Sequence, residues 1–407
     1  MIPATWTDIP ALGALPEHRR AALERYLAQG LPHTRQEDWH YTALDHLARL
    51  PLHPPAAADA HPVIDEAPGH DLIFAGERLV DTRSRLPATL LRARAEGDLT
   101  AAPALAPDTA LSALNAALWK SGGCLTVPPG QRLERPVFLR FLAGEPEAML
   151  HPRSLLRLDA GAEAVVVECY TGATPANYWR NPVTEIELEA GARLVHIRII
   201  EEGAAATHTG LTAARLAADS HYALLDLSLT GRVCRHELHL TLAGRGAACR
   251  LDGLFLTDGR RHSDHHLRVD HGVPSTSSRT TYRGVAAGRG RGIFDARVLI
   301  RPGADGADAR QDSRNLLLSP HAEIDAKPQL EIYADQVQAS HGATVGRLSD
   351  EALFYLRARG IDRIEARRLL LAAFAGEALG LVAKAGHNDW LMPRIEARLN
   401  EIGESIK

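Results

Sequence analysis

Cysteine is scarce in this sequence, and its four copies lie far apart, at Cys124, Cys169, Cys234 and Cys249. No two of them form a CxxC pair, so the pattern suggests neither a zinc knuckle nor a dense disulfide framework. Unpaired cysteine side chains are usually buried and behave as small hydrophobic groups. We therefore expect four reduced thiols inside the fold.

Long apolar runs and an excess of one charge are also missing. No window approaches the roughly 18 consecutive apolar residues of a membrane span, and the N-terminus lacks the basic stretch and apolar run of a signal peptide. Lys and Arg total 46 against 50 Asp and Glu, a formal net charge of -4 that offers no broad attraction to phosphate backbones. We expect a cytoplasmic protein whose partners are neither nucleic acids nor membranes.

The common catalytic motifs are absent from the sequence as well. It contains no GxxxxGK[ST] phosphate loop, no GxSxG nucleophile elbow and no HExxH zinc helix. The glycine and arginine run at residues 288–292 follows no strand-to-helix pattern, which favours a solvated turn over a phosphate site. The missing phosphate loop excludes nucleotide hydrolysis through that device.

Three regions differ in texture, and we place their boundaries at residues 1–121, 122–347 and 348–407. The pattern of the first region predicts a helical unit that also contains a small hairpin. Its signals are a helix that begins after Pro16 and ends at Gly30, a hairpin that turns near Gly76 and a second helix over about 109–119. Residues 51–70, rich in Pro, Ala and His, are typical of a linker.

The central region alternates polar and apolar residues with the period of two that is typical of strands, and no long helix interrupts it. Turns of small residues recur at intervals of roughly 30 residues, at 160–162, 190–192, 217–220 and 243–246. Repeats of strands and tight turns favour a right-handed parallel β-helix, in which each coil buries its apolar face against the next. A β-sandwich is the alternative, although one sandwich rarely uses more than 200 residues.

The last region carries strong helix signals. Ser349 and Asp362 are suited to cap two successive helices, and we expect Leu353, Phe354 and Leu356 of the first helix to point inward. The apolar surface of residues 362–385 is wider than a helix needs for one core. We therefore expect a partner to cover part of this surface.

Histidine is abundant, with 20 copies in the chain. A strand through residues 261–266 would project His262, Asp264 and His266 from one face, a nitrogen and oxygen ligand set suited to a divalent metal. A hydrogen-bonded or solvated polar face is the alternative. A rival function, a β-helix enzyme of the lyase or transferase type, would also use these three residues.

Four motifs resemble the SufD family of iron-sulfur cluster assembly subunits. The N-terminal motif is EDWHYT, and the C-terminal motifs begin with KPQLEIYAD and end with FYLRARGI. They occupy residues 37–42, 327–335, 340–346 and 354–361. The resemblance therefore brackets nearly the whole chain.

This resemblance implies a β-helix between helical regions, in a non-catalytic scaffold of the SUF system. Such a subunit pairs with its paralogue SufB through the β-helix and binds the ATPase SufC through its C-terminal helices. The nascent iron-sulfur cluster would be transient, and the isolated chain would hold no cofactor stably. Because its pairing surface is exposed, the isolated chain is expected to be able to form a homodimer.

The resemblance also implies residue roles. His341 corresponds to a histidine at the interface with SufB, where a neutral imidazole can bind iron. Its alternative role is to cap a turn before Gly342. Ala339 stands where the family has a cysteine, so cluster binding would rely on His341 and the partner. The paralogue SufB is a second rival identity for this chain, and Ala339 and the four scattered cysteines argue against it. The ATPase-binding surface would include Leu369, Leu370 and Phe374.

Overall fold

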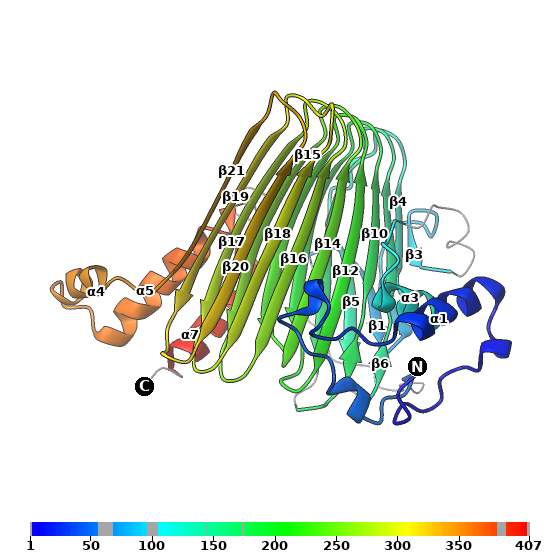
Figure 1. Ribbon diagram of the computed structural model, residues 1–407, viewed down its shortest axis with the longest axis horizontal. Helices are drawn as coiled ribbons and strands as arrows, with labels where there is room; N and C mark the ends of the chain where they lie inside the picture. The colour runs from blue at the N-terminus through cyan, green and yellow to red at the C-terminus, as the bar shows by residue number, and fades with distance from the viewer. Residues whose placement is uncertain are drawn as a thin grey trace.

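A computed structural model describes residues 2–55, 68–95, 105–143, 145–172, 175–380 and 388–404. It shows a long β-helix with helices near both of its ends (Figure 1). Most of the linker predicted over 51–70 lies outside the described residues. No helix in the described part of the chain is long and apolar enough to cross a membrane.

The N-terminal elements follow the predicted signals. Helix α1 begins after Pro16 and ends at Gly30, whose φ of 72° suits a residue without a Cβ. The predicted hairpin forms from β1 (His70–Ala75) and β2 (Arg78–Arg83), with Gly76 at its turn. The helices are α1 (Glu17–Gln29), α3 (Ala110–Leu118), α4 (Asp350–Arg357), α5 (Arg363–Gly376) and α7 (Asn388–Glu404), with short 3-10 turns at Leu12–Ala14, Glu37–Trp39 and Leu47–Arg49.

The strands form two sheets. The first, which we call the helix-covered sheet, contains β2 (Arg78–Arg83), β1 (His70–Ala75), β5 (Val137–Ala143), β8 (Glu163–Gly172), β11 (Arg193–Glu201), β13 (His221–Thr230), β15 (Ala248–Thr257), β17 (Ser277–Ala286), β19 (Asp308–Leu317) and β21 (Gln338–Gly346). The second, the strap-covered sheet, contains β20 (Glu323–Ile332), β18 (Arg291–Ile300), β16 (His262–His271), β14 (Val233–Leu242), β12 (Thr207–Leu216), β10 (Val183–Leu188), β7 (Arg153–Leu158), β4 (Gly123–Val127) and β3 (Leu91–Ala93), with the short β6 (Met149–Leu150) and β9 (Trp179–Arg180) beside them.

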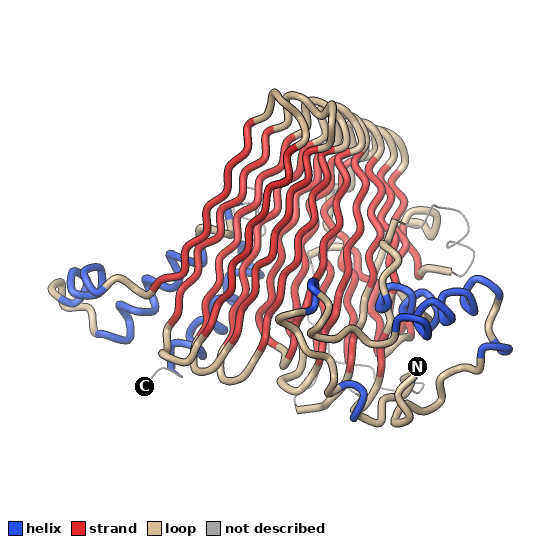
Figure 2. The backbone as a smooth tube through the Cα atoms, viewed as in Figure 1, coloured by secondary structure: helices blue, strands red, loops and turns tan. Residues whose placement is uncertain are grey.

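From β10 to β19, each strand pairs in parallel with the strand two positions further along the chain. Successive strands therefore alternate between the two sheets, and each pair of strands closes one coil (Figure 2). A sandwich would pair its strands mainly in antiparallel fashion. The predicted parallel β-helix is confirmed, and the sandwich alternative is wrong.

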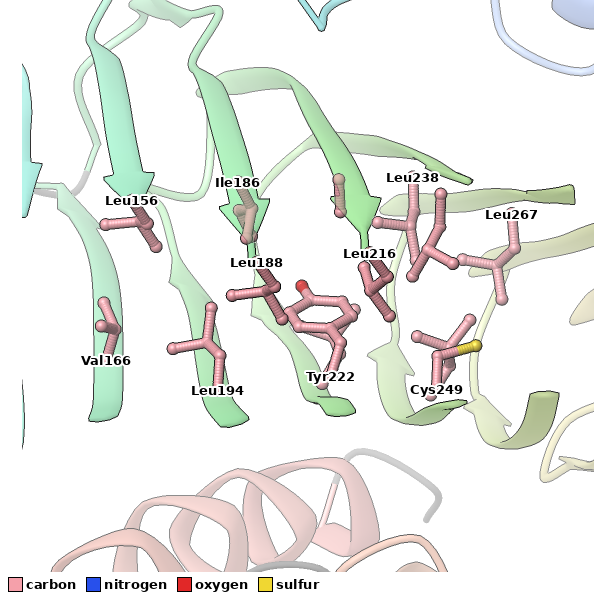
Figure 3. Packing of buried hydrophobic residues seen from close by; sticks show 14 of the residues in the cluster. Leu156, Val166, Ile186, Leu188, Leu194, Leu216, Tyr222, Leu238, Cys249 and Leu267 are labelled. Carbon is pink, nitrogen blue, oxygen red and sulfur yellow. The ribbon is translucent and has the colours of Figure 1, made fainter. Parts of the chain in front are cut away.

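The lumen of the β-helix holds the main core. Because side chains alternate along a strand, every second residue faces inward, and parallel register stacks equivalent residues into columns. Leu156, Ile186 and Ala214 form one such column on successive coils. Figure 3 shows the aliphatic layer that results. Each fully buried Leu, Ile or Val stabilises the fold by about 1.5–3 kcal/mol relative to an exposed one.

The four cysteines are buried thiols that form no disulfide, as expected. Burial raises the pKa of Cys169 and of Cys249 to about 12, so both thiols are neutral at physiological pH. The cysteines therefore act as packing residues.

Helices α5 and α7 pack against the outer face of the helix-covered sheet. Leu371 and Ala375 of α5 and Leu391 and Ile395 of α7 share one buried cluster with sheet residues such as Leu227. Ion pairs reinforce the contact, among them Arg394 with Glu201 at 2.6 Å. The tail is thus attached firmly to the β-helix.

Helix α4 differs from the prediction in one respect. Ser349 and Asp362 do cap α4 and α5, since their side chains accept hydrogen bonds from backbone N–H groups of the first turns. Phe354, expected to point inward, is 73% exposed. The helix extends away from the β-helix (Figure 1), so the core leaves this ring uncovered.

Candidate functional site

The β-helix ends in an open coil made of β20 and β21. Among the described residues, β20 pairs only with β18 and β21 only with β19, so each strand keeps one edge without a strand neighbour. Apolar side chains are exposed on the same coil, with Ile332 at 41%, Tyr333 at 61% and Val345 at 44%. Unpaired edges and exposed apolar groups together are features of a surface that another chain covers.

His341 lies on this open coil. It is in register with Gln311, Thr280 and Leu251 on the preceding coils, and all three are buried lumen residues. His341 occupies the same inward position but is exposed, because no further coil follows it. It lies inside strand β21, which excludes the alternative that it caps a turn. The imidazole is therefore available at the mouth of the lumen.

Ala339 is the neighbouring inward position on β21. It is in register with the buried Ala309 and packs partly against the lumen core. Its methyl group cannot bind a metal ion, so a ligand at this end of the chain has to come from another residue or from another chain.

Charged side chains form a network inside the lumen, which sequence reasoning missed. Arg198 pairs with Asp226 at 2.7 Å, and Asp226 also accepts hydrogen bonds from His265 at 2.9 Å and Tyr282 at 3.1 Å. All four are essentially inaccessible to solvent. Burial alone would raise the pKa of Asp226, but the charge of Arg198 and the contact with His265 hold it well below its usual value.

The network extends toward the N-terminal coils through Glu168, which contacts His196 at 3.1 Å and Thr184 at 2.8 Å. His196 also contacts the hydroxyl of Tyr222 at 2.9 Å. Burial opposes ionisation of Glu168, yet its contacts with His196 and Thr184 keep its pKa below the usual value. Alternation alone did not indicate that His196 and Arg198 face the lumen, because their orientation follows only from the register of the folded strands.

His262, Asp264 and His266 do share one face of β16, as the alternation predicted, and it is the outer face of the strap-covered sheet. Asp264 pairs with Arg235 and with His266, whose Nε2 lies 2.9 Å from its Oδ1. His262 contacts Thr42 at 2.7 Å, and burial lowers the pKa of His262 to about 4.

A guanidinium therefore stands beside Asp264, where a bound cation would need to be. Burial alone would raise the pKa of Asp264, but Arg235 and His266 hold it well below its usual value. In the described part of the chain, no group of three or more His, Cys, Asp or Glu residues is placed to hold a metal ion. The structure adds no support to the metal prediction or to an enzyme built on these residues.

The EDWHYT motif, residues 37–42, crosses the outer face of the same sheet, and we call it the strap. Trp39 stacks on Arg235, with the guanidinium carbon 3.9 Å from the ring centroid. Asp38 pairs with Arg268 at 3.0 Å, and Glu37 reaches Lys327 of β20 at 3.6 Å. The strap thus joins the N-terminal region to the open coil.

The predicted ATPase-binding residues lie on α5. Leu369 is exposed, whereas Leu370 and Phe374 are half-buried, and Phe374 packs against the cluster beneath the helix. Exposed Phe354 of α4 and Ile364 of α5 extend the apolar surface beyond the predicted set. The tail presents more uncovered apolar area than its own packing requires.

Comparison with known proteins defines the class to which this architecture belongs. A family described as the SufBD core domain of SUF system FeS cluster assembly matches residues 141–374. The chain is 31% identical over 389 residues to the iron-sulfur cluster assembly protein SufD of Escherichia coli, covering 93% of this chain and 91% of that protein. It is 30% identical over 396 residues to an iron-sulfur cluster assembly SufBD family protein of Synechocystis sp., covering 90% and 87%. The chloroplastic protein ABCI7 of Arabidopsis thaliana is 33% identical over 262 residues, covering 62% of this chain and 55% of that protein.

The chain therefore belongs to the SufBD family of iron-sulfur cluster assembly proteins. Within the family it is similar to SufD, which confirms the resemblance carried by the four motifs.

Proposed function

We propose that this chain is a non-catalytic scaffold subunit that pairs end to end with a sister subunit, SufB, and binds the ATPase SufC through its helical tail. The nascent iron-sulfur cluster is the cargo of this complex. The observation that carries the proposal is the open coil, where two unpaired strand edges, three exposed apolar side chains and His341 share one surface.

The open coil favours a partner with the same architecture. A second β-helix presents strand edges at the same spacing, so its terminal coil can continue the sheets and pair the free N–H and C=O groups of β20 and β21. Contact of this kind would place His341 at the junction, facing the partner's end of the lumen. Because Ala339 supplies no ligand, the partner would have to provide the thiolates that an iron-sulfur cluster requires.

The helical tail supports a mechanical role. Its exposed face carries Phe354, Ile364 and Leu369, while its buried face is fixed to the β-helix through α5 and α7. Glu377, which follows α5, pairs with Arg283 of β17 at 2.8 Å. A movement that the ATPase imposed on the tail would therefore reach β17, which only β19 separates from β21 of the open coil, as a rigid-body displacement.

Co-expression with the SufB and SufC partners tests the proposal. We expect the three chains to co-purify with an iron-sulfur absorbance, and Val345→Lys on the open coil to release the SufB partner, because a charge would be buried in the junction. Leu12→Lys, an exposed apolar position in the N-terminal region, is the matched control and should leave the complex intact. Full retention of the partner by Val345→Lys would show that the open coil is not the pairing surface.

His341→Ala in the same complex separates chemistry from assembly. We expect the three chains to stay together while the iron and sulfide content falls several-fold, because the imidazole is exposed and contributes little packing. An unchanged cluster content would remove His341 from the proposed site, and loss of the complex would assign it a structural role.

A further inference from the structure

A cavity in the N-terminal region lies far from the features used so far. It encloses about 220 Å3 between the segment before α1, the hairpin of β1 and β2, the end of α3 and strand β6. Asp8 and Lys120 are exposed at its mouth, whereas His151 and Met149 are buried at its floor. A cavity of this size can hold several water molecules or one small molecule. It is suited to a small metabolite.

His151 presents a hydrogen-bond donor that has no partner. The Asn181 side-chain nitrogen donates to the carbonyl oxygen of Leu111 at 2.9 Å, which fixes the orientation of this amide. The same nitrogen lies 3.3 Å from Nδ1 of His151, so Nδ1 is the acceptor and the ring proton is on Nε2. His151 is only 1% exposed, and its Nε2 has no hydrogen-bond partner among the described residues. A buried N–H of this kind costs free energy until a ligand accepts a hydrogen bond from it.

Glu77 provides a carboxyl group at the same cavity, which accepts hydrogen bonds where His151 donates one. One oxygen of its carboxylate accepts a hydrogen bond from the backbone N–H of His151 at 2.6 Å, which fixes the side chain at the cavity. Burial raises the pKa of Glu77 to about 7, against the opposing effects of this hydrogen bond and of the Lys120 and Arg19 charges. A cationic ligand would therefore be stabilised beside this carboxylate, since it would favour the ionised form.

Two cations line the cavity together with these groups. Arg19 is half-buried, and its guanidinium group donates to the backbone carbonyl oxygen of Trp119 at 2.9 Å. The guanidinium carbon also lies 4.9 Å from the centroid of the Trp119 ring, so the position of Arg19 is fixed. Lys120 follows Trp119 in the chain, and its side chain is exposed. With Asp8 and Glu77, the lining carries two cations and two carboxyl groups. This balance of charges is unsuited to a simple anion or a simple cation and suited to a ligand that carries both charges.

We propose that this cavity binds a small zwitterion, namely a free α-amino acid. Its carboxylate would accept hydrogen bonds from Nε2 of His151 and from the Arg19 and Lys120 side chains, and its ammonium group would face Glu77. The walls formed by Leu15, Leu118 and Met149 would contact its side chain. This site is independent of the scaffold role, because it lies at the opposite end of the β-helix from the open coil.

Calorimetric titration of the purified full chain tests the site. The probes are L-alanine, L-serine and L-leucine, with acetate and methylammonium as ligands that each carry one of the two charges. We expect saturable binding of at least one amino acid, and binding at least tenfold weaker for either half-ligand. Glu77→Gln should weaken amino-acid binding at least tenfold, because it removes the charge that faces the ammonium group.

The matched control is Glu24→Gln, an exposed glutamate on the neighbouring helix α1, which should bind as the wild type does. Lys120→Met provides a second variant that is expected to fold, since Lys120 is exposed, and it should weaken amino acids and acetate alike. Absence of saturable binding for every amino acid, equal affinity for acetate and amino acids, or unchanged affinity in Glu77→Gln would each overturn the proposal.

Discussion

The buried ion pair of Arg198 and Asp226 makes a sharp prediction about stability. Asp226→Asn keeps the size of the side chain but removes the charge that compensates Arg198, 2.7 Å away and fully buried. Removing one partner of a buried pair costs about 3–5 kcal/mol, because the other charge stays in the interior without compensation. Folded domains are stable by only about 5–15 kcal/mol, so this single change should cost a large part of the total.

Urea unfolding followed by tryptophan fluorescence measures the effect. We expect Asp226→Asn to lower the free energy of unfolding by about 3–5 kcal/mol. The double variant Arg198→Met with Asp226→Leu should recover at least half of that loss, because neither charge of this pair is then left buried without its partner. Asp270→Asn is the matched control, since its pair with Arg301 is largely exposed and should contribute at most about 1 kcal/mol.

A result within about 0.5 kcal/mol of wild type for Asp226→Asn, the range typical of surface substitutions, would refute the reasoning. So would a double variant less stable than Asp226→Asn. Either outcome would mean that Arg198 is compensated by groups other than Asp226.

Three further predictions concern packing, pH and the tail. A Cβ at Gly210 would lie 2.3 Å from Nδ1 of the buried His236, so Gly210→Ala should destabilise the chain by about 1–3 kcal/mol in the same urea assay. The free energy of unfolding should fall as the pH is lowered from 7 to about 4, because buried histidines with pKa values lowered to about 3 or 4 take up protons only in the unfolded chain. Each such histidine contributes up to about 1.4 kcal/mol per pH unit. Urea midpoints at pH 7 and 5.5 measure the slope. These residues are His151, His262 and His271. Glu77, whose pKa is raised to about 7, acts in the opposite sense between about pH 4.5 and 7 and offsets about one histidine, so a slope of zero or of opposite sign would contradict this assignment. Leu369→Asp on the exposed face of α5 should reduce capture of the SufC partner at least tenfold in a pull-down, whereas exposed Glu24→Gln should not; equal capture would show that this face is not used.

The fold could be predicted from sequence because its signals are local and repeated. The period of two, the recurring small-residue turns and the helix caps at Ser349 and Asp362 each reflect backbone geometry over a few residues. Gly161 and Gly191, both with positive φ, repeat the same turn on successive coils. These features define strands, turns and helix ends without knowledge of distant contacts.

The contents of the two faces of a strand could not be predicted in the same way. In β11 the polar residues His196 and Arg198 face the lumen, while the apolar Ile197 and Ile199 face outward beneath the tail helices. Alternation alone suggests the opposite, because apolar residues normally mark the core side of a sheet. The reversal arises because helices distant in sequence bury the outer face and the lumen network satisfies the inner charges.

In the candidate site, too, local features were predictable from the sequence and contacts between distant residues were not. The shared face of His262, Asp264 and His266 followed from the period of two, but the strap that covers this face depends on contacts such as that of Thr42 with His262, between residues more than 200 positions apart. His341 was predicted from a sequence motif, whereas its inward position at the open coil is known only from its register with Gln311 in the structure. Exposure of a terminal coil is a property of the assembled fold.

Hydrogen exchange tests the central claim most directly. Backbone amides of β20 and β21 should exchange faster than those of β16 in the isolated chain, and the SufB partner should protect them while leaving β1 and β2 unchanged. Exchange at β20 and β21 that the partner does not alter, with new protection elsewhere, would contradict the account.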